Sequence, residues 1–137
     1  MAGLTPAEVS EILGTFKGSK AFMTRDCVVA VSAVYRAAGM YPKVGPVLDL
    51  RRATRLARAV RSDLVQATRL HLGDVGWCEI DPAAAQFLDC GVCEHADQQT
   101  LAIASGRGRW LAPGPAGVLS LGSAAAAWRP SGGCDGN

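Results

Sequence analysis

The sequence signals for secondary structure change near Gly73, and this division most constrains how the chain can fold. Before Gly73, apolar residues recur at helical spacing between capping residues. After it, they form short runs separated by glycine and proline turns. Helices followed by strands predict an α+β fold whose strands form an antiparallel sheet. The 137 residues fit one domain, which we expect at 1–129, followed by a flexible tail at 130–137.

The first predicted helix begins with a complete capping signal. Thr5 can cap the helix, Pro6 suits its first position, and Glu8 stands three residues after Thr5, where it completes a capping box. This helix should run to about Leu13 and end at Gly14.

A second helix is predicted from Arg25 to about Ala38, with Thr24 or Asp26 as its cap and Gly39 at its end. Nearly every face of this helix is apolar, through Cys27, Val28, Val29, Ala30, Val31, Ala33 and Val34. A helix of this kind is buried in the middle of its domain.

One more helix and a series of strands complete the prediction. The helix should extend from Asp49 to about Thr68, could break near Ser62, and should end at 71–74. The predicted strands are Val75–Ile80, Ala85–Cys90, Thr100–Ala104, Arg109–Ala112 and Val118–Leu121. Turns are expected at Gly106–Gly108 and 113–117, and a short helical turn at Ser123–Trp128.

Cys27 is the first candidate for a chemical role, because it stands in the first turn of the second predicted helix. Unpaired N–H groups and the positive end of the helix dipole stabilise an anion at that place. A thiol attacks as its thiolate, and a nearby imidazole would complete a nucleophile–base pair. The competing interpretation is a small buried hydrophobic residue, which is the ordinary role of a free cysteine.

Three segments, taken in chain order, carry a resemblance to a known family. They are Asp26-Cys27 at the head of an apolar helix, Gly73-Asp74-Val75 opening the first strand, and the hairpin 100–110. In this order the chain resembles the NlpC-type cell-wall cysteine peptidases, which have a papain-like fold. The chain also ends in Val118-Leu-Ser-Leu followed by Ala-Ala-Trp128-Arg129. With this ending it is more similar still, over residues 8–129, to a poorly characterised branch of that superfamily, encoded among the tail genes of bacteriophages and prophages.

This resemblance implies a papain-like arrangement in which N-terminal helices pack on a small antiparallel sheet. It implies that Cys27 is the counterpart of the family's nucleophile, with Asp26 beside it at the helix N-terminus. It also implies a place in the virion tail, at the tail tip or baseplate. The partners would then be other phage tail proteins, with peptidoglycan as a further candidate.

The chain departs from the family at the catalytic base. NlpC-type peptidases take their base from a histidine at the start of the strand predicted here at Thr100–Ala104, where this chain has Gln98 and Gln99. His95, a few residues upstream, could serve as a displaced base. Because losing a general base costs roughly two to four orders of magnitude in rate, we expect a catalytically inactive tail component that acts through protein contacts. The alternative is an active cysteine peptidase or amidase that cleaves peptidoglycan peptides with Cys27 and His95.

A weaker alternative is a metal-binding module. Cys90 and Cys93 have the spacing of a metal knuckle, His95 follows two residues later, and Cys78 could supply a fourth ligand. Four such groups are the set that tetrahedral zinc takes, and cysteines can also hold an iron–sulfur cluster. The competing interpretation is a loop with two ordinary cysteines and no cofactor.

Charge and hydropathy limit the other classes of function. A net charge of +2 is too small to predict a nucleic-acid partner. The arginines between 51 and 69 lack interleaved aromatic residues and are read as a solvated helix face or a protein interface. The longest uncharged stretch, 114–128, contains Pro115 and falls short of a membrane span. With no leader at the N-terminus, we expect synthesis in the host cytoplasm and five reduced cysteines.

Overall fold

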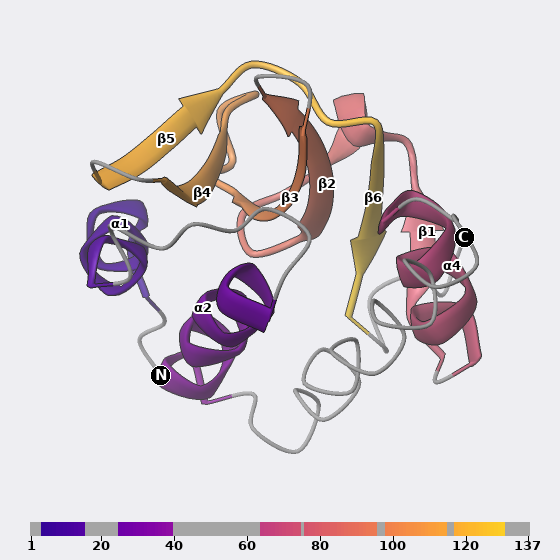
Figure 1. Cartoon of the computed structure of the whole chain (residues 1–137), viewed down its shortest axis with the longest axis horizontal. Coiled ribbons are helices and arrows are strands. Elements are labelled where there is room, and N and C mark those ends of the chain that lie inside the picture. The colour runs from indigo at the N-terminus through magenta and orange to yellow at the C-terminus, as the bar shows by residue number, and fades with distance from the viewer. Residues whose placement is uncertain are drawn as a thin grey trace.

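The structure, a computed structural model, describes residues 4–15, 25–39, 64–74, 76–95, 98–114 and 117–130. Within these ranges three α-helices precede a six-stranded antiparallel sheet, so the predicted α+β class is confirmed (Figure 1). The helices are α1 (Pro6–Gly14), α2 (Arg25–Ala37) and α4 (Leu64–Asp74), and a short 3₁₀ helix, η1, spans Pro82–Ala84. The strands are β1 (Cys78–Ile80), β2 (Cys90–His95), β3 (Gln98–Ala104), β4 (Trp110–Gly114), β5 (Gly117–Leu121) and β6 (Ala126–Arg129).

The strand order is β1-β6-β2-β3-β4-β5. Strands β2 to β5 follow one another as hairpins, whereas β6 returns to lie between β1 and β2 and pairs with both. The last described strand is therefore an interior strand, and it holds β1 in the sheet.

One face of the sheet, the helix-side face, packs against the helices (Figure 1). Helix α2 contacts β3 and β4, α1 contacts β4 and β5, and α4 contacts β1. The strand residues that point to this side join the main core, among them Cys90, Val92, Leu101, Ile103, Leu111 and Trp128. Helix α2 supplies Ala30, Val31, Val34 and Tyr35 to this core, all buried, whereas Arg36 and Ala37 near its end are exposed.

The opposite face of the sheet, the second face, carries a separate apolar cluster of mostly small side chains. Its buried members are Cys93, Ala102, Ala104, Trp110, Ala112 and Ala127. Because successive strand residues point to opposite faces, each central strand contributes to both clusters.

Local signals determined the helix ends as predicted. In α1 the Thr5 hydroxyl accepts from the Glu8 N–H at 3.2 Å, and the Glu8 carboxylate accepts from the Thr5 N–H at 2.9 Å. After α2, Gly39 has a φ of +78°, a conformation that glycine adopts without strain. The turn predicted at 106–108 is present, with positive φ at both of its glycines.

Four predicted elements were wrong. Helix α4 continues past the predicted end near Thr68 to Asp74, so Gly73 and Asp74 lie in the helix and the first strand begins only at Cys78. The strand predicted at Ala85–Cys90 is absent, because the chain turns at 87–88 after η1, and the next strand is Cys90–His95, the segment interpreted as a metal-binding loop. The predicted helical turn at Ser123–Trp128 is replaced by β6. Most of the helix predicted from Asp49, and the tail beyond Pro130, lie outside the described residues.

Among the described helices, none has the length and apolar character needed to cross a membrane.

Candidate functional site

Cys27 lies in the first turn of α2, as predicted, and α2 packs through Val31 and Val34 against the core that β3 shares. Asp26 lies inside the same turn and not at the cap position, because the helix already begins at Arg25. The side chains of Asp26 and Cys27 lie outside the described residues. The structure therefore places the backbone of this candidate nucleophile at the N-terminal end of α2.

The start of β3 is the place where the resemblance calls for a histidine, and Gln99 occupies its helix-side face. Gln99 shares that face with Leu101 and Ile103, since alternate residues of a strand point the same way. The Gln99 Oε1 atom accepts a hydrogen bond of 2.6 Å from the backbone N–H of Leu64, the first residue of α4. The side chain therefore satisfies one of the free N–H groups at the helix start. A carboxamide has no basic nitrogen and does not act as a general base at neutral pH.

His95 ends β2, where it pairs with Gln98. It lies two residues after Cys93, which is buried in the second-face cluster, so strand alternation assigns His95 to the second face. Helix α2 packs on the other face. The register therefore places the candidate displaced base on the side of the sheet away from the helix that carries Cys27.

The same alternation separates the candidate metal ligands. Cys90 belongs to the helix-side core and Cys93 to the second-face cluster, so the two thiols lie on opposite faces of β2. Cys78 lies in β1, with β6 between it and β2. Within the described ranges no group of three or more His, Cys, Asp or Glu side chains is placed to hold a metal ion. A knuckle needs its two cysteines in a loop, and here their segment is a strand.

Burial also lowers the reactivity of these thiols. The pKa of Cys93 is raised to about 12 because burial penalises the thiolate. Cys90 is fully buried, and Cys78 is partly exposed. At neutral pH, Cys93 is therefore a protonated packing residue.

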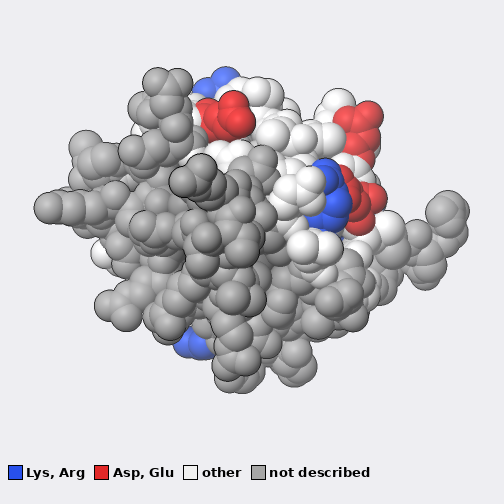
Figure 2. Space-filling model, turned by 45° about the vertical axis from the view of Figure 1, so that its right-hand side comes forward, with Lys and Arg blue, Asp and Glu red and all other residues white. Residues whose placement is uncertain are grey.

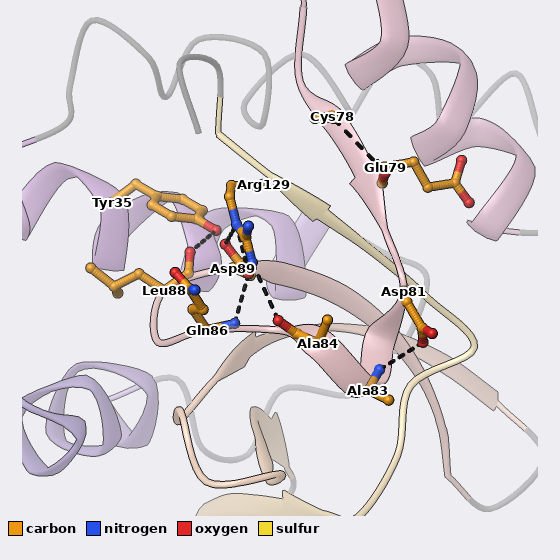
Figure 3. A network of polar contacts seen from close by, with 10 residues as sticks. All are labelled: Tyr35, Cys78, Glu79, Asp81, Ala83, Ala84, Gln86, Leu88, Asp89 and Arg129. Carbon is orange, nitrogen blue, oxygen red and sulfur yellow. Dashed lines mark hydrogen bonds and ion pairs between the residues drawn. The ribbon is translucent and has the colours of Figure 1, made fainter. Parts of the chain in front are cut away.

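A polar network that the sequence did not indicate connects the start of β2 to the end of β6 (Figure 3). The Arg129 guanidinium donates to both carboxylate oxygens of Asp89, with an Nη2–Oδ2 distance of 2.9 Å, and to the Ala84 carbonyl at 3.3 Å. The Asp89 carboxylate also accepts from the backbone N–H of Gln86 at 2.8 Å. Asp89 is only 4% exposed, so this ion pair is largely shielded from water.

Tyr35 extends this network from α2. Its hydroxyl donates to the Leu88 carbonyl at 2.9 Å (Figure 3), and its ring packs edge-to-face on Trp77 with centroids 5.6 Å apart. Burial, together with the neighbouring Cys90 and Asp89, raises the Tyr35 pKa well above 10. The phenol therefore stays protonated and acts as a hydrogen-bond donor, which holds the end of α2 against the sheet.

Charged side chains of the described residues do not gather into a patch of one sign on the face seen in Figure 2. Arg69, the last of the arginines between 51 and 69, pairs with Glu79 of β1, with an Nε–Oε1 distance of 2.9 Å. This ion pair therefore links α4 to β1.

A pocket of about 650 Å³ opens beside the β3–β4 turn, between η1 and the segment that precedes β6. Ala85, Ala104 and Trp110 contribute apolar surface, while Asp81 and Arg109 contribute opposite charges. The pocket has no signal in the sequence, because its residues come from three separate segments and none of these contains a motif.

Comparisons of the chain with models of known protein families, with curated proteins and with solved structures found no match.

Proposed function

We propose that this chain is a structural component of a bacteriophage-like tail, at the tail tip or baseplate, that acts through contacts with other tail proteins. The proposed scaffold is a degenerate papain-like fold. Support comes from the resemblance of the sequence to the phage-tail branch of the NlpC-type superfamily. It comes also from the packing of the Cys27 helix on an antiparallel sheet, the arrangement which that resemblance implies.

The proposal that the protein is catalytically inactive rests on the hydrogen bond made by the Gln99 side chain. The position that should hold a base holds a carboxamide, and its oxygen is bound to the first N–H of α4 at 2.6 Å. The imidazole nearest in sequence, His95, is assigned to the opposite face of the sheet. Of these two side chains, neither Gln99 nor His95 would therefore supply Cys27 with the positioned proton acceptor that nucleophilic catalysis requires.

The assignment is tested by two measurements on the full chain. Purified protein, incubated with peptidoglycan peptides, should release no more product than the Cys27→Ala variant. Tail particles isolated from the source should contain the chain in a fixed ratio to the other tail proteins, measured by quantitative mass spectrometry. Absence from the particles would refute the structural role.

The second candidate function is that of a cysteine peptidase or amidase. The position of Cys27 in the first turn of a packed helix favours it. Cleavage that Cys27→Ala abolishes would establish it. If His95 is the base, His95→Ala should remove the same activity, whereas Gln99→Ala should leave it in place.

A further inference from the structure

The pocket beside the β3–β4 turn has the size and charge distribution of a ligand site, and it lies apart from Cys27 and Gln99. Its volume of about 650 Å³ falls in the range of small-molecule sites, roughly 300–1,000 Å³. Small side chains and glycines form much of its lining, including Ala85, Ala104 and Gly122. Such a lining leaves backbone N–H and C=O groups within reach of a ligand.

Arg109 supplies a fixed positive charge at this pocket. Its Nε donates to the Ser120 hydroxyl at 3.1 Å, and its Nη2 donates to the Ser120 carbonyl at 2.7 Å. Both acceptors are neutral, so they orient the guanidinium without compensating its charge. The Nη1 atom lies over Gly122, at 3.4 Å from where a Cβ would stand, and the described residues include no carboxylate paired with Arg109.

Asp81 supplies a fixed negative charge at the same pocket. Its Oδ1 accepts the backbone N–H of Ala83 at 2.9 Å and so caps η1 (Figure 3). This bond orients the carboxylate, which is exposed to solvent. Like Arg109, Asp81 is held by a neutral partner.

The two charges together select the type of ligand. A simple anion attracted by Arg109 would be repelled by Asp81, and a simple cation would meet the reverse arrangement. A molecule with an ammonium group and a carboxylate satisfies both. A short peptide would occupy more of the volume than a single amino acid, and it could bond to the exposed backbone of the glycine turn.

We propose that this pocket binds the free ends of a short zwitterionic peptide, with the ammonium group at Asp81 and the carboxylate at Arg109. Calorimetric titration of the full chain with triglycine should give saturable binding. N-acetyl-triglycine and triglycine amide, which each lack one charge, should bind about tenfold or more weakly, the loss expected for one charged hydrogen bond.

Substitutions at the two charged residues, with a control in the same turn, test where the peptide binds. Asp81→Asn keeps an acceptor for the Ala83 N–H but removes the charge, and Arg109→Gln removes the guanidinium, so each should weaken triglycine binding about tenfold or more. Arg107 lies in the same turn as Arg109, but it is exposed and does not line the pocket. The substitution Arg107→Gln should therefore leave the affinity for triglycine unchanged. Amide resonances of Gly106, Gly108 and Gly122 should shift on titration.

Four results would overturn the proposal. They are no saturable binding at millimolar triglycine, equal binding of the blocked peptides, affinity unchanged by Asp81→Asn, and resonance shifts confined to another part of the chain. Because Asp81→Asn preserves the cap of η1, its effect is readable even if Arg109→Gln perturbs β5.

Discussion

Gly91 leaves the space that the Trp110 ring occupies on the second face of the sheet. It lies within β2, where glycine weakens a strand unless another group approaches the backbone closely. That group is the Trp110 ring, since a Cβ on Gly91 would lie 2.5 Å from Cζ3. Trp110 is 2% exposed and packs among buried alanines, so the ring has little room to move. The absent side chain of Gly91 is therefore part of the packing of the tryptophan.

The substitution Gly91→Ala should lower the free energy of unfolding by about 1–3 kcal/mol, the usual cost of overpacking a core. Urea denaturation monitored by tryptophan fluorescence measures it. Gly14→Ala is the matched control, because its Cβ would stand 3.8 Å from Val118 Cγ2, an ordinary contact, and helix propensity favours alanine. Equal effects of the two substitutions would contradict the packing role of Gly91.

Glu79 gives the protein a small pH-dependent contribution to stability. Its pKa lies below the ordinary value of 4.5 because Arg69 donates two hydrogen bonds of 2.9 Å to the carboxylate. Since the folded-state pKa is lowered, the stabilisation is complete above the unfolded pKa and is lost as pH falls through the folded value. The side chains of Arg69 and Glu79 are both more than 40% exposed, so this ion pair stabilises the fold by less than about 1 kcal/mol.

We therefore expect Glu79→Gln to be less stable than the native chain at pH 7. The difference should shrink toward zero below about pH 4 and also in high salt. Urea unfolding of both proteins at pH 7 and below about pH 4 measures this difference in stability. A difference that does not change with pH would refute its assignment to the Arg69–Glu79 ion pair.

At the scale of elements, the strength of local signals separates what the sequence predicted from what it did not. Helix α1 was predicted closely because Thr5 and Glu8 form a capping box from residues three apart. Strand β6 was missed because the alanine-rich 123–128 favours helix locally, whereas pairing with β1 and β2 makes its last part a strand. The two charged groups of the pocket were missed for the same reason, because only the fold brings Asp81 near Arg109.

The start of α4 depends on a side chain from β3. The substitution Gln99→Ala removes the acceptor of the Leu64 N–H, and we expect a loss of about 1 kcal/mol, the typical cost of losing a cap. Gln86→Ala is the control, since Gln86 is exposed and its described bonds use only its backbone. Thermal unfolding compares the two, and an equal change in Tm would show that the Gln99 contact contributes nothing.

The place of β6 between β1 and β2 depends on the pair of Asp89 and Arg129. Removing one partner of a shielded ion pair leaves the other charge uncompensated. Arg129 is 21% exposed, so we expect Asp89→Asn to cost about 2–4 kcal/mol, somewhat less than the fully buried case. The measurement is urea denaturation, with amide hydrogen exchange at Trp128 as a local probe. Unchanged exchange at Trp128 would show that β6 does not depend on this pair.

At the scale of the whole molecule, the sheet carries two apolar clusters that share the same strands. Cys90 belongs to the main core and Cys93 to the second-face cluster, and both thiols are fully buried. Each cysteine can therefore serve as a probe of its own cluster. Because β2 contributes to both clusters, neither can open without disturbing the pairing that supports the other. We therefore expect the two faces to unfold in one cooperative transition.

Alkylation by iodoacetamide in increasing urea tests this coupling, with each cysteine quantified by mass spectrometry. In the absence of urea, Cys90 and Cys93 should resist modification, because both are buried and the Cys93 pKa is about 12. The partly exposed Cys78 should react before Cys90 and Cys93. Cys90 and Cys93 should then become reactive at the same urea concentration, which should equal the midpoint seen by fluorescence. Modification of Cys93 well before Cys90 would show that the alanine-rich second face opens independently of the helix-side core, and the single-domain prediction would then fail.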